Sequence, residues 1–199
     1  MLRTAEEFGF ERFHLVGYSG GGASSVAFAA KHPGRLLSLA LLEPAWMGND
    51  ELSPEEQEVW REFDRIATLP SAEMMPPFLK MQLAPGVESP PPPPGPPSPW
   101  MATRPAGLRT LIATFRSTTL DLDDLRGFTQ PVYFAFGGKS NPSYYARMAD
   151  RARAIFPTFT LEVFDERHHF DPPHRIEPER LAASLITLWQ RGEMPRVRA

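Results

Sequence analysis

The chain has 199 residues, a net charge of −3 at pH 7 and no cysteine. This length suits one domain with a sizeable core and leaves room for an inserted subdomain. The 21 Lys and Arg residues are scattered, which excludes the basic surface of a nucleic-acid-binding protein, and the lack of cysteine excludes disulfides. The N-terminus carries acids and no apolar run approaches the roughly 18 residues of a membrane span, so we expect a cytoplasmic protein without such a span.

Strand and helix patterns alternate at the two ends of the chain. The continuous apolar run at residues 36–42 is typical of a parallel strand that is buried on both faces. The predicted strands occupy residues 12–18, 36–42, 131–136 and 159–164. The predicted helices between and around them cover residues 2–8, 20–31, 143–155 and 178–190. The strand–helix–strand order indicates βαβ units, so we predict an α/β fold with about four parallel strands flanked by helices.

The middle of the chain, residues 44–119, shows helix patterns and no strand pattern. Residues 53–56 form a capping box that begins one predicted helix, and apolar residues at helical spacing predict another around residues 108–115. We interpret this region as a helical cap inserted into an α/β core made of residues 1–43 and 120–199. Its many methionine and aromatic side chains either line an apolar acyl pocket or form the core of the cap itself.

Proline is unusually frequent in one stretch of the predicted cap, residues 89–99, which holds eight of the 23 prolines of the chain. Each proline ring fixes φ and removes an amide donor, so such a stretch favours extended polyproline II. Because the stretch lies between apolar segments, we predict a stiff connector within the cap. A ligand for a proline-recognition domain is the alternative interpretation.

The first predicted strand passes directly into a helix through the sequence Gly17-Tyr18-Ser19-Gly20-Gly21. A G-x-S-x-G motif between a strand and a helix is typical of a nucleophile elbow, a sharp turn that exposes one serine hydroxyl. We expect the flanking glycines to be required because a Cβ there would clash. Ser19 is the predicted nucleophile. Gly20, whose amide would bind an oxyanion, and Tyr18 are the predicted substrate and oxyanion residues.

A serine nucleophile needs a base, and three of the five histidines cluster in residues 165–174, directly after the last predicted strand. His169 is our predicted base because it lies far enough from that strand for a loop to turn over the sheet edge. His168 and His174 are the alternatives. A competing interpretation is a metal site with the ligands His168, His169, Asp171 and His174.

Together these motifs resemble the α/β-hydrolase superfamily over nearly the whole chain. The resemblance implies the chain order serine, acid, histidine, and usually an aspartate in a G-x-x-D turn. Here that turn, at residues 137–140, reads G-G-K-S, so the usual acid is missing. Some members instead carry the acid at the end of the strand after the nucleophile helix, which is Glu43 in this chain. We take Glu43 as the acid. The alternatives are that Asp165 or Asp171 is the acid, or that Glu43 is only a solvated residue at the entrance of the cap.

This resemblance implies hydrolysis of carboxylic esters or related small acyl compounds through an acyl-enzyme, with no cofactor and no metal. A serine at the nucleophile position argues against the dehalogenase and epoxide chemistries of related enzymes, which use aspartate there. The strands that precede the elbow strand in this superfamily, and the second oxyanion donor that they supply, have no counterpart here. We therefore expect a fragment of a longer protein, or a homo-oligomer formed through an exposed strand edge at Phe13, Leu15 and Val16. The alternative function is a catalytically impaired remnant that acts as a binding or interaction module.

Overall fold

The computed structural model describes residues 1–88, 91, 94–96 and 98–194. Within these residues, four strands form one fully parallel sheet with the order β1-β2-β3-β4. The strands are β1 (Phe13–Tyr18), β2 (Leu36–Leu42), β3 (Val132–Gly137) and β4 (Phe159–Phe164). The predicted α/β fold with about four parallel strands is therefore confirmed.

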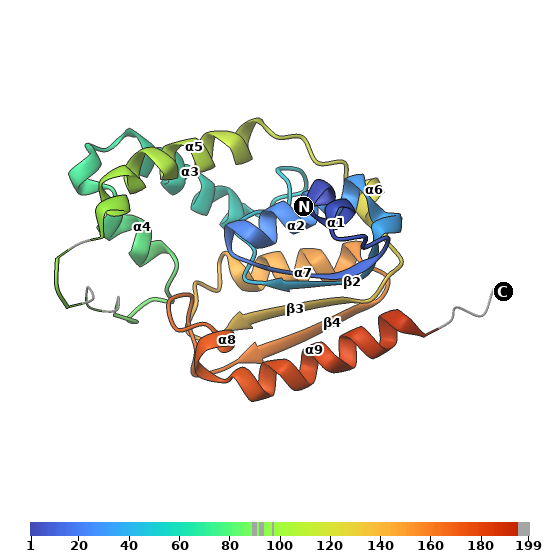
Figure 1. Ribbon diagram of the computed structural model, residues 1–199. Helices are drawn as coiled ribbons and strands as arrows, with labels where there is room; N and C mark the ends of the chain where they lie inside the picture. The colour runs from blue at the N-terminus through green and yellow to red at the C-terminus, as the bar shows by residue number, and fades with distance from the viewer. Residues whose placement is uncertain (89–90, 92–93, 97, 195–199) are drawn as a thin grey trace.

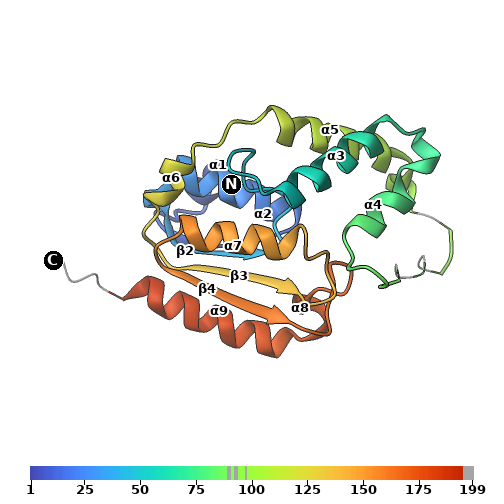
Figure 2. The same cartoon turned by 180° about the vertical axis from the view of Figure 1, so that it is seen from behind.

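Helices cover both faces of this sheet, as Figure 1 shows. Helix α9 lies alone on one face, whereas α2 and α7 lie on the other face together with α1 and α6; Figure 2 shows the same layers from behind. Their bounds are α1 (Leu2–Glu7), α2 (Gly20–Lys31), α6 (Leu122–Arg126), α7 (Tyr145–Ile155), α8 (Pro173–Ile176) and α9 (Pro178–Glu193), and a 3-10 turn, η1, covers Pro33–Arg35. Because both faces are covered, six of the seven residues of β2 are buried.

The strand register brings the carboxyl ends of all four strands to the same end of the sheet, which we call the sheet edge. Tyr18 lies opposite Leu42, Leu42 lies opposite Ala135, and Gly137 lies opposite Phe164. The segments that follow the strands thus leave the sheet side by side. Residues that lie far apart in the sequence can therefore meet at this edge.

A second group of helices lies at the end of the sheet toward which the strands point (Figures 1 and 2). It contains α3 (Pro54–Thr68), η2 (Ser71–Glu73), α4 (Met75–Met81), η3 (Pro99–Thr103) and α5 (Arg104–Ser117). The capping box at the start of α3 is formed: Ser53 Oγ accepts from the Glu56 amide at 3.2 Å, and the Glu56 carboxylate accepts from the Ser53 amide at 3.0 Å. Of the predicted connector at residues 89–99, positions 89, 90, 92, 93 and 97 lie outside the described residues.

One hydrophobic cluster extends from the sheet into these helices, so that Leu39 and Phe134 of the strands belong to the same core as Trp60 and Leu108. The buried ion pair between Arg151 of α7 and Glu56 of α3, at 3.0 Å, also joins the two parts. The division into core and cap stays a prediction, because the packing between them is continuous.

The end of α4 is also joined to the loop that follows β3. The Asn141 amide donates to the Gln82 carbonyl at 3.0 Å, and the Ala84 amide donates to the Lys139 carbonyl at 2.9 Å. These bonds surround an isolated antiparallel bridge between Leu83 and Ser140. The helical group is therefore tied to the sheet edge at this point.

Strand β1 forms one edge of the sheet and, among the described residues, pairs with β2 alone. Val16 of this strand is 41% exposed, and Phe10 just before it is 55% exposed. The described residues contain no helix long and apolar enough to cross a lipid bilayer.

Candidate active site

Ser19 stands at the turn between β1 and α2, as the G-x-S-x-G motif predicts. Its backbone has φ 52° and ψ −120°, a conformation that non-glycine residues rarely adopt. The Ser19 amide donates to the Leu42 carbonyl of the neighbouring strand at 3.0 Å, and the Ser19 carbonyl accepts from the Ala45 amide at 2.9 Å. These contacts hold the strained serine in place at the end of the sheet.

The glycines around Ser19 differ in what requires them. A Cβ on Gly17 would lie 2.4 Å from Ser25 Oγ and 2.6 Å from the Gly21 carbonyl oxygen, so no side chain fits there. A Cβ on Gly22 would lie 2.8 Å from Pro44 Cα. A Cβ on Gly21, in contrast, would meet nothing within 4 Å. The expected clash is therefore confirmed at Gly17 and wrong at Gly21, because Gly21 points to solvent on the first turn of α2.

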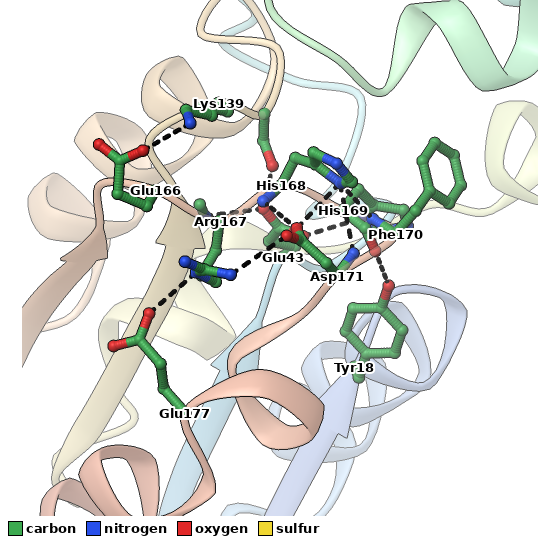
Figure 3. Close-up of polar contacts among 12 residues, drawn as sticks. Tyr18, Glu43, Lys139, Glu166, Arg167, His168, His169, Phe170, Asp171 and Glu177 are labelled. Carbon is green, nitrogen blue, oxygen red and sulfur yellow. Dashed lines mark hydrogen bonds and ion pairs between the residues drawn. The ribbon is translucent and has the colours of Figure 1, made fainter. Parts of the chain in front are cut away.

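His169 reaches Ser19 from the loop after β4. Its Nε2 lies 3.2 Å from Ser19 Oγ, and the residue is 7% exposed. Tyr18 holds this loop: its hydroxyl donates to the main-chain carbonyl of His169, and its ring stacks on the imidazole at 5.1 Å (Figure 3). Tyr18 was predicted at the substrate and oxyanion site, but its side chain is instead turned toward the His169 loop and does not line the cavity beside Ser19.

Two glycines at the end of β3 allow the His169 loop to approach the sheet. A Cβ on Gly137 would lie 2.2 Å from the Arg167 carbonyl oxygen, and one on Gly138 would lie 2.6 Å from the Asp165 carbonyl oxygen. Arg167 stabilises the loop by pairing with Glu177 at 2.9 Å, as Figure 3 shows. The Gly-Gly pair is thus needed for close backbone contact between two loops.

Glu43 completes the contact chain from the end of β2. Its Oε2 lies 2.9 Å from His169 Nδ1, and its Oε1 accepts from the Gly137 amide at 2.9 Å and from Ser140 Oγ. Only 1% of Glu43 is exposed, so it is not the solvated residue of the alternative interpretation. Asp165, one alternative acid, is exposed. Ser140 occupies the position of the aspartate in a G-x-x-D turn, and its hydroxyl donates to the Glu43 carboxylate.

The other histidines of the cluster face other partners. His168 Nδ1 accepts from the Phe170 amide at 3.1 Å, and the His168 amide donates to Asp171 Oδ1 at 2.6 Å. The His174 ring meets the edge of Tyr18 at 4.8 Å, and burial lowers the pKa of His174 below its ordinary value. His168 Nδ1 also lies 3.0 Å from Asp171 Oδ1, but within the part of the chain that the structure describes no three metal-ligating side chains gather around one point. The geometry therefore gives no support to the metal-site interpretation.

A cavity of about 390 Å³ opens beside Ser19 and Gly20. Gly20 is the first residue of α2, so its amide has no acceptor within the helix. The cavity walls are mainly aromatic and aliphatic, with the residues Trp60, Phe63, Phe78, Trp100, Leu108, Leu111, Ile112, Phe115 and Tyr144. Other residues of the helical group, such as Trp46 and Met74, are buried in the core and do not line the cavity, whereas Trp60 and Leu108 belong to the core and also line the cavity.

Two further side chains at the site were not predicted from the sequence. The Tyr145 hydroxyl lies 3.0 Å from His169 Nδ1 and donates to Gln82 Oε1, and Gln82 lines the cavity. Burial raises the pKa of Tyr145 well above its ordinary value. Tyr145 starts the helix that follows the Gly137–Ser140 turn, and this position is the sequence signal that places it near the strand ends. An aromatic residue on the apolar face of a helix is otherwise typical of core packing.

Comparison with known proteins adds a family and a fold. A family model described as "Alpha/beta hydrolase family" matches residues 2–184. A 2-hydroxy-6-oxo-6-phenylhexa-2,4-dienoate hydrolase from Comamonas testosteroni is 34% identical over 70 residues, which cover 35% of this chain and 24% of that protein.

Three solved structures illustrate the fold. A membrane phospholipase A, described as a bacterial virulence factor, aligns with 98% of this chain and 62% of its own at 19% identity and a TM-score of 0.63. An esterase from Exiguobacterium antarcticum aligns with 94% of this chain and 70% of its own (17% identity, TM-score 0.63). Naproxen esterase from Bacillus subtilis aligns over 94% of this chain and 63% of its own length (16% identity, TM-score 0.55). At these identities the matches show the fold alone, and the chain spans 62–70% of the length of these structures.

Proposed function

The chain belongs to the alpha/beta hydrolase family, and on this premise we propose that it hydrolyses carboxylic esters or related acyl compounds through a serine nucleophile. One observation carries the proposal: Ser19 Oγ, His169 and the Glu43 carboxylate form a continuous chain of contacts of 3.2 and 2.9 Å. This is the arrangement of nucleophile, base and orienting acid that acyl transfer requires.

In the proposed reaction, Ser19 Oγ attacks the substrate carbonyl carbon while its proton passes to His169 Nε2. The imidazolium that forms keeps its Nδ1 proton, which Glu43 accepts as a hydrogen bond. The Gly20 amide stabilises the oxyanion. When the tetrahedral intermediate collapses, the alcohol leaves with the proton of Nε2, and an acyl-Ser19 ester remains. Water then repeats the same steps and releases the acid and the free serine.

The cavity supports an apolar, ring-bearing substrate. Its walls are mainly aromatic and aliphatic, and its volume lies within the range of small-molecule sites. The name of the Comamonas testosteroni relative carries a phenyl group, a group that such walls would accept. We propose that residues 44–119 act as the cap over this site, because they supply most of the cavity walls while the sheet edge supplies Ser19 and Gly20.

Covalent labelling tests this function directly. A fluorophosphonate probe is expected to label the wild-type chain and not Ser19→Ala, and p-nitrophenyl esters with aromatic acyl groups are expected to be cleaved faster than straight-chain ones. Ser24→Ala is the matched control, because Ser24 lies one helical turn away and its hydroxyl donates to the Gly20 carbonyl at 3.2 Å. A folded wild-type chain that is not labelled, and whose turnover equals that of Ser19→Ala, would exclude the proposed reaction.

The exposed edge of β1 favours a second candidate function, an interaction module. Val16 and Phe10 expose apolar surface beside a strand edge that is free of partners among the described residues. A second copy of the chain is the occupant that we propose for this edge. The same labelling experiment separates the two functions, because a purely binding module would not react with the probe at Ser19.

A further inference from the structure

The Nδ1 atom of His169 faces two oxygen atoms. Glu43 Oε2 lies 2.9 Å away, and the Tyr145 hydroxyl oxygen lies 3.0 Å away. For His169 to take a proton at Nε2, Nδ1 must carry the hydrogen of the neutral ring. Which group fixes that hydrogen at Nδ1 therefore decides whether His169 can act as a base. Glu43 is one such group, and the position of Tyr145 makes it a second.

The direction of the Tyr145 hydroxyl proton follows from Gln82. The Tyr145 hydroxyl donates to Gln82 Oε1, and the amide nitrogen of the same side chain donates to the Phe78 carbonyl at 3.4 Å. The main-chain carbonyl of Gln82 accepts from the Asn141 amide, which fixes the residue on the loop beside β3. Since the single proton of Tyr145 points to Gln82, the lone pairs of its oxygen remain for the Nδ1 hydrogen of His169.

Packing holds the imidazole in the same orientation. The Tyr145 ring lies nearly parallel to the His169 ring, at 5.4 Å and 16°, and the Tyr18 ring stacks on it at 5.1 Å and 27°. Tyr145 is fully buried and Gln82 is 4% exposed. The contact between the Tyr145 hydroxyl and His169 Nδ1 is therefore buried in the protein interior.

We propose that Tyr145 and Gln82 form a positioning pair that fixes His169 with its hydrogen on Nδ1 and leaves Nε2 free for the Ser19 proton. The inference rests on the proposed function for its catalytic meaning, but the state of the His169 ring does not depend on it. Neither residue touches the reacting atoms. Because Gln82 also lines the cavity, the pair connects the wall of the substrate site to the orientation of the base.

The test removes Glu43 first, so that Tyr145 is the remaining acceptor at Nδ1. In Glu43→Ala, we expect neutral His169 to keep its hydrogen on Nδ1. In Glu43→Ala/Tyr145→Phe, a substantial fraction should carry it on Nε2. Long-range 1H–15N NMR spectra report the two ring nitrogens directly, and His169→Gln assigns the signals. Tyr133→Phe is the matched control, because Tyr133 is also a buried tyrosine, whose hydroxyl donates to Glu162 at 2.7 Å away from the site.

A second variant keeps the test decisive if Tyr145→Phe does not fold. Glu43→Ala/Gln82→Met removes the acceptor of the Tyr145 proton, so the hydroxyl can turn and donate to Nδ1, and the hydrogen on the ring should then move to Nε2. When Glu43 is left in place, the single change Tyr145→Phe should slow fluorophosphonate labelling of Ser19 about fivefold to tenfold, the effect of one hydrogen bond. Tyr133→Phe should not slow the labelling.

The two proposals fail in different ways. If both double variants keep the hydrogen on Nδ1 as Glu43→Ala does, the positioning pair is overturned, whatever the labelling shows. If the hydrogen moves as expected but the wild-type chain is never labelled, the proposed hydrolase function fails and the role of Tyr145 and Gln82 in setting the His169 ring stands.

Discussion

The turn of the proposed nucleophile and the proposed acid–base pair are built in different ways. At the Ser19 turn, Gly17 allows close contacts with residues of the same elbow, and Gly22 allows close contact with Pro44 just after β2. Glu43 and His169 are instead separated by 126 residues, and Glu43 is held by a loop 94 and 97 positions further along the chain. The Ser19 turn thus depends on its own glycines and on the neighbouring strand end at residues 42–45, whereas the contact between Glu43 and His169 also needs β3, β4 and the loops that follow them.

The largest effect is expected on the acid–base side, from Glu43→Gln. The Gly137 amide and Ser140 Oγ would fix the amide oxygen of the new side chain, so its NH2 group would face His169 Nδ1 and force the hydrogen onto Nε2. We expect kcat to fall by about 10⁴, as for the corresponding change in a serine protease triad. Steady-state hydrolysis of a p-nitrophenyl ester measures it.

Glu162→Gln is the control for this change, because Glu162 is a partly buried carboxylate that contacts Tyr133, Ser184 and Arg180 away from Ser19. Glu43→Ala/Ser140→Asp should recover part of the lost activity by returning the acid to its usual turn, whereas Glu43→Ala/Ser140→Ala should not. An unchanged kcat in Glu43→Gln would show that Glu43 is not the acid.

On the nucleophile side, the expected effect is on stability and differs between Gly17 and Gly21. Gly17→Ala places a Cβ 2.4 Å from Ser25 Oγ and within 3 Å of two main-chain atoms, which should reduce the free energy of unfolding by about 3 kcal/mol. Gly21→Ala should be neutral or slightly stabilising, because its Cβ meets nothing and alanine favours helix. Urea unfolding of both variants measures this difference, and equal losses of stability would contradict the local account of the elbow.

The smallest effect is expected at His174, which joins the two regions through its contact with Tyr18. Burial, with a contribution from Arg175, lowers the pKa of His174 below 6.5 in the folded state. The unfolded chain therefore binds this proton more readily, so stability is lost as the pH falls from 6.5 toward the lower folded value. His174→Asn should show a slightly smaller fall of Tm below pH 6.5 than the wild type. Identical falls would mean that His174 does not contribute.

The same contrast explains what could be predicted from the sequence. The elbow was recognisable because strand, turn and helix signals follow one another within a few residues, and strands β2 and β4 have the bounds that were predicted from the sequence. Helices α6 and α8 were not predicted, because five and four residues are too short for a periodic pattern. The expected clash at Gly21 was wrong, because only the structure shows which glycine of the elbow faces another segment.

The acid–base side was harder to predict because its contacts depend on the register of the sheet. Glu43 could be singled out by the position where β2 ends, and its contact with His169 agrees with that expectation, although its role stays a prediction. Gln82 has no local signal that separates it from core residues, and Tyr145 has only its position at the start of the helix after the Gly137–Ser140 turn. Their contacts with each other and with His169 arise only when α4, α7 and the loop after β4 come together.

The bridge between Leu83 and Ser140 has a consequence for how a ligand enters the cavity. Residues 82–84 are bonded to the loop that holds the Glu43 carboxylate, so lifting the helical group as one rigid lid from this point would also release the acid. The cavity walls on α5 make no such bonds to this loop among the described residues, and Arg109 of α5 donates instead to the carbonyls of Ala67 and Leu69. A movement that keeps the Glu43 contacts intact would therefore have to shift α5 relative to residues 82–84. Opening of the cavity would thus involve the wall on α5, whereas the position of the Glu43 carboxylate depends on a different side, at residues 82–84 and 139–141.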